Sequence, residues 1–135
     1  AAVSNPAQAL TDAMRAALLA HQPLRTLLGG AHVHEERPRG AREPMVLFDT
    51  IETRDWSTAE QKAHEHFVSL AVRTNSRSRR LAQQILDEIE TVLDGAALSL
   101  AGHRLVNLRI VFWSVARQGE NFGASVRLRA ATEPV

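Results

Sequence analysis

Apolar residues recur along this chain with two periods, and the change between them predicts an alternation of helices and strands. Three- and four-residue steps are typical of an amphipathic helix, and two-residue steps of a strand with one face on a core. Helical spacing joins these residues near the N-terminus: Leu10, Met14, Leu18 and His21. Asn5-Pro6 predicts the start of this helix, since Asn caps helices and Pro suits their first position. The helix should end near His21 to Gln22, because Pro23 disfavours helical geometry in the residue before it.

A second main helix follows from a longer apolar stripe in the middle of the chain. Its members fall on one side at helical spacing: Leu81, Ala82, Ile85, Leu86, Ile89, Val92 and Leu93. Asn75 or Ser76 can cap its start, and Gly95 can close it as a left-handed cap. Between the two main helices, Leu24 to Leu28 can form one further turn that Gly29-Gly30 stops.

Alternation with period two predicts the strands of a sheet. The stretches with this pattern are 45–54, 65–74, 105–115 and 122–130, with short strands around Val33 and at 98–100. Because hairpins dominate the connections, we expect one α+β domain spanning 1–135. It should hold a mostly antiparallel sheet of four to six strands with two main helices packed on one face.

The strand at 105–115 predicts what the second face of the sheet carries. One set of its side chains should face the core: Val106, Leu108, Ile110 and Phe112. The other set should face away from it: Asn107, Arg109, Val111 and Trp113. We therefore expect a second face that combines Trp113, Val111 and several arginines, a mixture that favours a protein–protein interface.

Composition narrows the function classes. The chain has 135 residues, 44% of them hydrophobic, and a formal net charge of +1. This size suits one domain with a packed core, and the small charge implies no general attraction to nucleic acid. The absence of cysteine excludes a disulfide framework, a thiol nucleophile and a cysteine-ligated metal site. No apolar run approaches the ~20 residues that span a membrane, and Ala1 to Ala9 lack signal-peptide features, so synthesis in the cytoplasm is expected.

Histidines are the candidate metal ligands: His32, His34, His64 and His66. His64 and His66 share one face of a predicted strand, but a zinc site needs a third ligand that the pattern does not supply. No carboxylate pair is placed at a productive separation, and no nucleophile motif or Gly-rich phosphate loop occurs. We therefore expect no catalytic residue, metal or cofactor. A small metal-dependent enzyme that uses His64 and His66 is the alternative from another class.

Exposed aromatic and charged residues are instead candidates for a protein interface. Trp56, beside Asp55, lies in a charged connection between two strands, where a large ring either tucks into the fold or serves a partner. Trp113 is the second aromatic candidate. The charged candidates lie at the two ends of the second main helix: Arg77, Arg79 and Arg80 at its start, and Asp87, Glu88, Glu90 and Asp94 toward its end. Both groups oppose the helix dipole, so we expect a neighbouring subunit or the solvent to compensate them.

Three segments, by their order and spacing, resemble a family of small phage tail proteins. The segments are Asp55-Trp56-Ser57-Thr58, Glu65-His66-Phe67-Val68-Ser69-Leu70-Ala71-Val72 and Ala101-Gly102-His103-Arg104-Leu105-Val106. The family comprises the tail-completion or tail-terminator proteins of long-tailed phages, and the similarity extends over residues 9–132. The arginine-rich, lysine-poor composition resembles the versions in gene transfer agents of alphaproteobacteria, such as the Rhodobacter-type particle.

The resemblance implies a structural virion protein in the tail or neck of the particle. Such proteins form a ring, usually a homo-hexamer, that caps the tail tube, ends its elongation and joins the tail to the head connector. The implied partners are the tail tube protein and a head–tail connector or stopper protein, and DNA passes through the lumen without specific binding. No catalysis is required. A head–tail adaptor or stopper ring is the alternative within the same particle, because those proteins are also small and ring-forming.

Overall fold

The computed structural model describes residues 5–135 and places them in three helices and six strands. The elements are α1 (Pro6–Ala20), α2 (Gln22–Leu28), β1 (Val33–His34), β2 (Met45–Asp55), β3 (His64–Arg73), α3 (Arg79–Leu93), β4 (Ser99–Leu100), β5 (His103–Gln118) and β6 (Asn121–Pro134). The first four residues of the stretch 1–9, which was expected to lack a signal peptide, lie outside the described residues. In the described part, no helix is long and apolar enough to cross a membrane.

The helix boundaries near the N-terminus confirm the prediction. The Asn5 side chain accepts a hydrogen bond from the backbone N–H of Ala7 at 2.8 Å, and Pro6 is the first helical residue. The single turn predicted for Leu24 to Leu28 is the seven-residue helix α2. Pro23 lies in its first turn, where the missing N–H of proline costs nothing, so the helix can begin before it. Gly29 ends α2 with a φ of 75°, a conformation that residues with a Cβ rarely adopt.

α3 begins later than predicted, although its apolar stripe and its end agree. Ser78, not Asn75 or Ser76, is the N-cap, and its hydroxyl accepts a hydrogen bond from the backbone N–H of Arg80 at 3.2 Å. The prediction was wrong because several residues of capping type precede the helix, and only the path of the chain selects among them. Asp94, with an extended backbone, is the C-cap of α3. Gly95 follows with a φ of 72°, but its N–H donates to Leu108 O at 2.8 Å, so it does not close the helix as predicted.

The six strands form one sheet in the order β1-β2-β3-β6-β5-β4. β2 and β3 make the predicted hairpin, in which Asp55 lies opposite His64. β5 and β6 make the second long hairpin, and β6 joins the two by pairing with β3. Only the short contact between β1 and β2 is parallel among the described strands. The chain is therefore an α+β protein with a mostly antiparallel sheet, as predicted.

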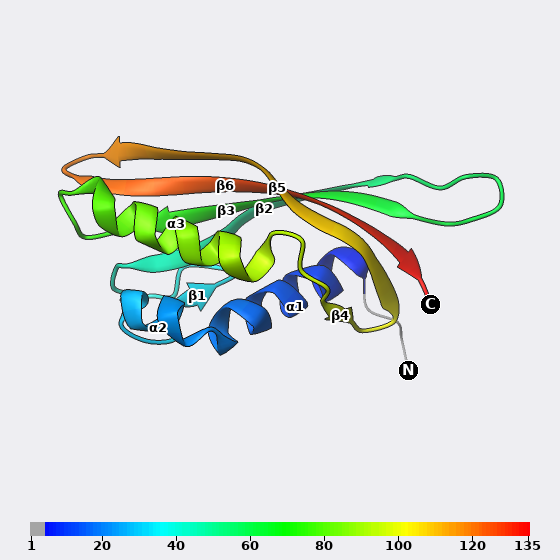
Figure 1. The fold of residues 1–135 in the computed structure, drawn as a ribbon, viewed down its shortest axis with the longest axis horizontal. Helices are drawn as coiled ribbons and strands as arrows, with labels where there is room; N and C mark the ends of the chain where they lie inside the picture. The colour runs from blue at the N-terminus through cyan, green and yellow to red at the C-terminus, as the bar shows by residue number, and fades with distance from the viewer. Residues whose placement is uncertain (1–4) are drawn as a thin grey trace.

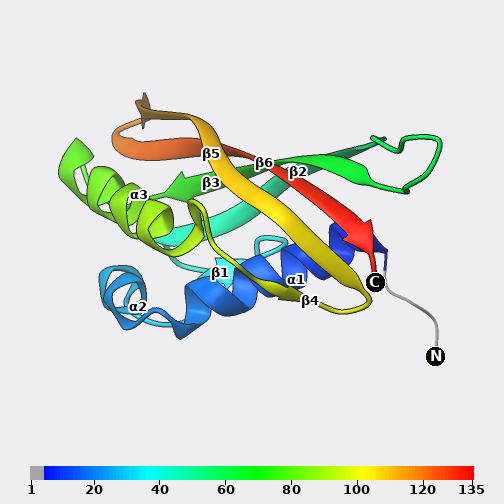
Figure 2. The ribbon, with the colours of Figure 1, turned by 45° about the vertical axis from the view of Figure 1, so that its right-hand side comes forward.

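Figures 1 and 2 show α1, α2 and α3 on one side of a twisted sheet, with α2 as a short helix beyond the two predicted main ones. The core fills the space between the layers. Every second residue of β6 from Phe122 to Ala130 is buried there, together with Met14 and Leu18 of α1 and Ile89 of α3. We call the opposite side of the sheet, where Figures 1 and 2 show no helix of the described chain, the open face. Alternation and strand pairing place these larger side chains on its central part: Glu52, Arg54, Glu65, Phe67, Arg109, Phe112, Arg127 and Arg129.

Two bulges in β5 correct the predicted faces of this strand. The pairing register with β6 shifts at Val106 and at Val111, so each is an extra residue without a cross-strand partner. Beyond the second bulge, Trp113 lies opposite the buried Val126, which places Trp113 on the helix-bearing side. Phe112 takes its place on the open face. Val106 and Phe112 were expected in the core, but they are exposed, because each bulge displaces the alternation by one residue.

Candidate interface surfaces

The connection between β2 and β3 extends past the rest of the sheet, at the right of Figure 1. The backbone N–H of Trp56 donates to Ala63 O at 2.9 Å, which continues the hairpin pairing beyond the strands. Asp55 Oδ1 accepts a hydrogen bond from the backbone N–H of Ser57 at 3.0 Å, and hydrogen bonding to the side chain and backbone of Ser57 lowers the pKa of the Asp55 carboxyl. The Asp55 carboxylate therefore helps to fix the turn that carries Trp56.

Trp56 contacts its own chain and also keeps accessible surface. The Arg129 guanidinium lies 5.1 Å from the centre of the indole ring, and the residue is 46% exposed. A shallow hollow of about 510 Å³ adjoins the ring and is lined also by Gln61, Val106 and Glu133. Trp56 is thus half tucked against the sheet, and the half that remains exposed is a candidate contact for a partner.

Glu65 is a buried carboxylate at the centre of an arginine cluster on the open face. The Arg129 Nε–H donates to Glu65 Oε2 at 2.6 Å, and the Arg54 Nε–H donates to Glu65 Oε1. Burial alone raises the pKa of Glu65, but the hydrogen bonds from Arg129 and Arg54 outweigh it and hold the pKa below its usual value. Two guanidinium groups share one carboxylate, so this cluster carries surplus positive charge.

The rest of the open face adds more arginine and exposed aromatic surface. Arg127 lies 4.8 Å from the centre of the Phe67 ring and 3.6 Å from Glu52. Arg109 lies directly opposite Arg129, an arrangement of like charges that destabilises paired strands. In the described part of the chain, no carboxylate lies within ion-pair distance of Arg109.

The charges in the central part of the open face do not balance. Four arginines and two glutamates give it a formal charge of +2: Arg54, Arg109, Arg127 and Arg129 against Glu52 and Glu65. Further along the strands, Arg104 pairs with Glu133 and adds no net charge. Phe112, which is 57% exposed, lies among the central charges. The open face therefore combines basic and apolar surface, as expected for the second face of the sheet, although Phe112 and not Trp113 supplies the ring.

The predicted arginines near the start of α3 lie at the end of the molecule opposite the β2–β3 hairpin tip (Figure 1). Arg77, which precedes the helix, pairs with Glu120 at 3.2 Å, and both side chains are largely exposed. The Arg79 guanidinium lies 5.4 Å from the centre of the Phe122 ring. Arg80 is exposed in the first turn of α3. Partners within the chain thus accompany Arg77 and Arg79.

The predicted acidic residues divide between the fold and the surface. Glu88 Oε2 lies 2.6 Å from His21 Nε2, so this carboxylate ties α3 to the junction of α1 and α2. Asp87 and Glu90 are exposed on α3, and Asp94, the C-cap residue that follows the helix, is exposed too. We call these three residues the acidic stripe. Asp94 also accepts a hydrogen bond from the backbone N–H of Ile110 at 2.9 Å.

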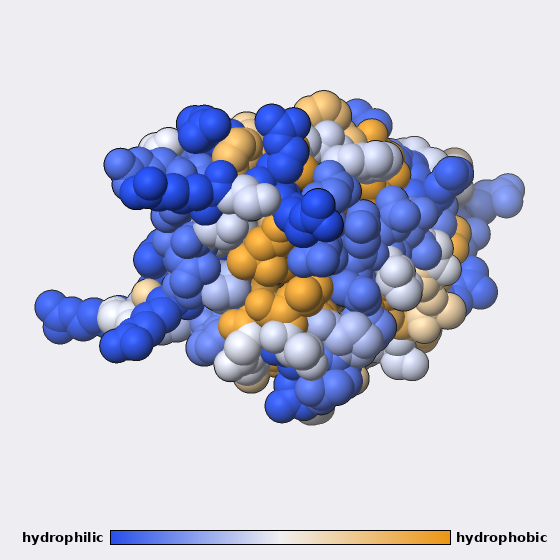
Figure 3. All heavy atoms as spheres, turned by 60° about the vertical axis from the view of Figure 1, so that its left-hand side comes forward, coloured by the Kyte–Doolittle hydropathy of each residue, from blue (hydrophilic) through white to orange (hydrophobic). Residues whose placement is uncertain are grey.

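A hollow of about 380 Å³ lies between α2 and α3, and Asp87 of the acidic stripe contributes to its lining. Pro23 and Leu27 of α2 and Asp87 and Glu88 of α3 contribute to its lining. Figure 3 views the end of the molecule where α2 and the start of α3 lie, and shows apolar surface gathered among hydrophilic side chains. This side of the helical layer therefore presents acidic groups next to apolar surface.

Trp113 lies apart from the other predicted interface residues. It is 50% exposed on β5, on the helix-bearing side of the sheet. The neighbouring Val111 is 51% exposed, and β4 covers only the first residues of β5. The structure therefore does not bring the predicted set together in one patch but distributes it over the hairpin tip, the start of α3, the acidic stripe and the edge at β5.

His66 is buried with both ring nitrogens engaged, which bears on the metal alternative. Its Nδ1 lies 2.8 Å from Thr53 Oγ1 and its Nε2 lies 2.8 Å from Thr132 Oγ1. Burial lowers the pKa of His66 to about 4, and the charges of His64 and His103 add to the effect. The His64 and His66 rings are 6.3 Å apart, but His66 offers no free nitrogen to a metal.

The other histidines form no metal centre either. The rings of His32 and His34 are 6.2 Å apart, and burial, His32 and Arg15 lower the pKa of His34. Within residues 5–135, no three side chains of His, Asp or Glu converge as metal ligands would.

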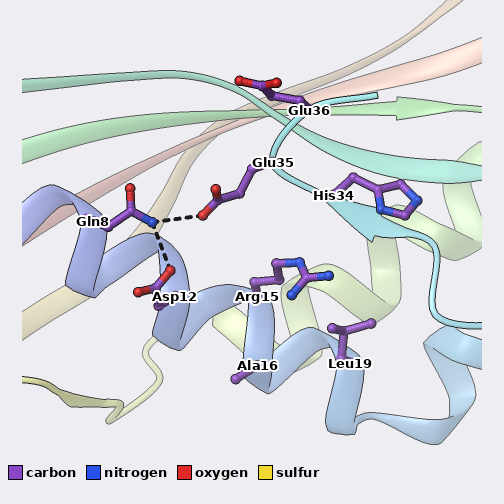
Figure 4. Close-up of a pocket in the computed structure, with 8 residues that line it drawn as sticks. All are labelled: Gln8, Asp12, Arg15, Ala16, Leu19, His34, Glu35 and Glu36. Atoms are coloured by element: carbon purple, nitrogen blue, oxygen red, sulfur yellow. Dashed lines mark hydrogen bonds between the residues drawn. The ribbon is translucent and has the colours of Figure 1, made fainter. Parts of the chain in front are cut away.

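Figure 4 shows a polar hollow of about 600 Å³ between α1 and the segment after β1. Gln8 Nε2 donates to Asp12 Oδ1 at 2.8 Å and to Glu35 Oε1 at 2.9 Å, and Arg15 Nε–H donates to Val33 O at 2.9 Å. These groups link α1 to β1 and the residues that follow it.

Sequence analysis missed the cluster around Glu65. The alternation of β3 placed Glu65 away from the core, but only the pairing of β3 with β2 and β6 shows that Arg54 and Arg129 converge on it. A sequence signal exists in part: arginines and glutamates at alternate positions of three predicted strands indicate a charged sheet face.

Comparison with known proteins gives a family and a fold. The family model described as "Tail completion protein gp17" matches residues 12–133. A solved structure from the "Virion of native gene transfer agent (GTA) particle" superposes with a TM-score of 0.87 at 24% sequence identity, covering 96% of this chain and 99% of that chain. At this identity the superposition shows a shared fold. The search of curated proteins found no match.

Proposed function

Because the chain belongs to the tail completion protein gp17 family, we propose that it forms the ring that terminates the tail tube. The family is a structural component of the phage tail, so the chain is a virion protein and not an enzyme. The observation that carries the proposal is the family match over 12–133, which spans nearly all of the described elements. In this proposal the ring caps the last layer of the tube, ends its elongation and provides the surface for the head connector.

The proposed ring is a homo-hexamer of one tail-terminator-like domain spanning 1–135. A closed ring needs two different surfaces on each subunit that fit one another. The open face carries surplus arginine, and the acidic stripe on the helical layer carries carboxylates. Its other partners are the tail tube protein and the connector or stopper protein. DNA passes through the lumen without specific binding, because many phosphate contacts would retain the strand.

The proposed particle is a phage or a gene transfer agent. The similar solved structure comes from a gene transfer agent virion, and it covers almost the whole chain with the same fold. The abundance of arginine beside the single Lys62 fits the same group of particles. A head–tail adaptor or stopper ring is the alternative function, since it would belong to the same neck and would use the same kind of ring.

Electron microscopy of particles from cells that lack this gene tests the proposal. Abnormally long tubes without heads are expected, since nothing then stops tube growth. Tails of normal length that stay unattached, or DNA-filled heads that leak, would instead assign the protein to the connector side. Intact particles that still infect or transfer genes would contradict a structural role in assembly.

A further inference from the structure

We propose that the open face of one copy docks on the acidic stripe and the α2–α3 hollow of a second copy. The inference rests on the proposed ring, and it names the two surfaces that would meet between neighbouring subunits. The occupant of the open face is thus another copy of this chain, bound through its helical layer.

The arginines of the open face outnumber the carboxylates beside them, so this surface can accept an anionic partner. Arg109 lies opposite Arg129, and the buried carboxylate beside them, Glu65, is already shared by Arg129 and Arg54. Arg127 and Glu52 form a partly exposed pair. Like charges directly opposite one another destabilise a sheet, so an acidic partner above Arg109 stabilises it.

The acidic stripe, in turn, has no basic side chains near it in the sequence. No lysine or arginine occurs in residues 81–103, which include all of α3 after its first two residues. Asp87 and Glu90 are three residues apart on α3, so they are neighbours on its surface, and Asp94 caps the end of the same helix. No ion pair joins Glu90 to another described residue.

The two surfaces also match in size and in apolar content. Asp87 and Asp94 are separated by about 10 Å along a helix with a rise of 1.5 Å per residue. Arg127 and Arg129 are about 7 Å apart along a strand, and the three steps from β2 to β5 add about 14 Å across the sheet. Phe112, 57% exposed beside these arginines, supplies an aromatic anchor, and the α2–α3 hollow with Pro23 and Leu27 supplies an apolar recess.

The contact must join different copies. Figures 1 and 2 show α3 on the side of the sheet opposite to the open face, so one chain cannot bring the two surfaces together. A contact between two unlike surfaces is heterologous, and repeated by rotation it closes into a ring. The open face and the helical layer are therefore the two sides of each subunit within the proposed ring.

Paired charge reversals test the inference through the state of self-association. Arg109→Glu alone and Glu90→Arg alone are each expected to weaken self-association about tenfold or more, because each leaves like charges facing one another. An equimolar mixture of the two variants is expected to restore it. In a ring where the two variants alternate, every contact between these positions joins an acidic to a basic side chain. Arg39→Glu, in the exposed loop before β2, is the matched control and should leave association unchanged.

Sedimentation or mass photometry of the full chain, with an added single-stranded oligonucleotide in a second series, distinguishes the outcomes. Variants that associate like the wild type, or a mixture that restores nothing, would overturn the docking surfaces while leaving the terminator role to the gene-deletion experiment. A wild-type chain that stays monomeric at its highest soluble concentration would overturn docking on a second copy. Loss of oligonucleotide binding in Arg109→Glu with unchanged self-association would show that the open face binds nucleic acid, contrary to the inference.

Discussion

The Arg129 guanidinium lies over the Trp56 ring, 5.1 Å from its centre, and so joins the β2–β3 hairpin tip to the middle of the sheet. The same guanidinium donates to the buried Glu65. One arginine therefore links the aromatic residue of the hairpin tip to the buried carboxylate at the centre of the arginine cluster. The contact with Arg129 is the contribution of Trp56 to the fold, and the exposed part of its ring is the predicted contribution to assembly.

Replacing Trp56 should leave the fold intact and weaken assembly. For Trp56→Ala we expect a loss of about 1–2 kcal/mol in the free energy of unfolding, since the half-buried ring and its contact with Arg129 are both removed while the core stays intact. Denaturant unfolding measures the stability, and sedimentation or capping of purified tubes measures the assembly. Trp56→Phe, which keeps a ring over Arg129, should have a stability and an assembly between those of the wild type and Trp56→Ala. A sharply lowered melting temperature for Trp56→Ala would identify Trp56 as a core residue instead.

Glu65 and Glu52 offer a matched test of the open face. Glu65→Gln should lower the melting temperature clearly, because it leaves two arginines without their shared carboxylate. Glu52→Gln should change it little, because Glu52 is largely exposed and 3.6 Å from Arg127. Thermal unfolding followed by circular dichroism compares the two. Equal effects of the two substitutions would mean that burial of Glu65 adds nothing to its role.

Protonation of His66 should make stability depend on pH. The pKa is about 4 in the folded protein and near 6.5 when unfolded, so between these values the unfolded chain binds a proton that the folded chain does not. The free energy of unfolding should therefore fall as pH falls from about 6.5 to about 4, by up to about 3 kcal/mol. Denaturant unfolding at neutral pH and near pH 4.5 measures it for the wild type and for His66→Gln. The wild type should lose more stability than His66→Gln, and parallel curves would contradict the prediction.

The start of α3 can be located by removing capping side chains. Ser78→Ala should cost about 1 kcal/mol, because the hydroxyl accepts from the backbone N–H of Arg80. Asn75→Ala, at the position first predicted as a cap, should cost much less. Denaturant midpoints of the two variants decide between the positions, and a larger loss for Asn75→Ala would move the cap upstream.

The elements that the sequence predicted well are those that local chemistry decides. Asn5-Pro6 and Gly29 act through caps and backbone conformations within one turn, and the structure confirms both. The alternation of β3 and β6 was also confirmed, since neither strand contains a bulge against the other. Ser78 shows the limit, because capping residues in succession give several equivalent starts.

The parts that escaped prediction depend on register. A bulge at Val111 moves Phe112 to the open face and Trp113 to the helix-bearing side. No residue type at this position predicts a bulge. The cluster of Arg54 and Arg129 around Glu65 joins three strands, so it exists only once their pairing is known. The open face could be predicted in kind, as arginine with aromatic residues, and Arg109 was placed on it correctly, but its aromatic residue, Phe112, was not.

The bulges at the two long edges of the sheet have a consequence for how copies of this chain can meet. β5 breaks its register at Val106 and Val111, and β2 breaks its register between Phe48 and Thr50. A regular edge invites another strand to add, and sheets that add in this way grow into fibrils without a fixed length. Interrupted edges resist that addition, so neighbouring copies are left to meet through their faces, in assemblies of finite size. A protein proposed to stop the growth of a polymer is in this way also protected from starting one.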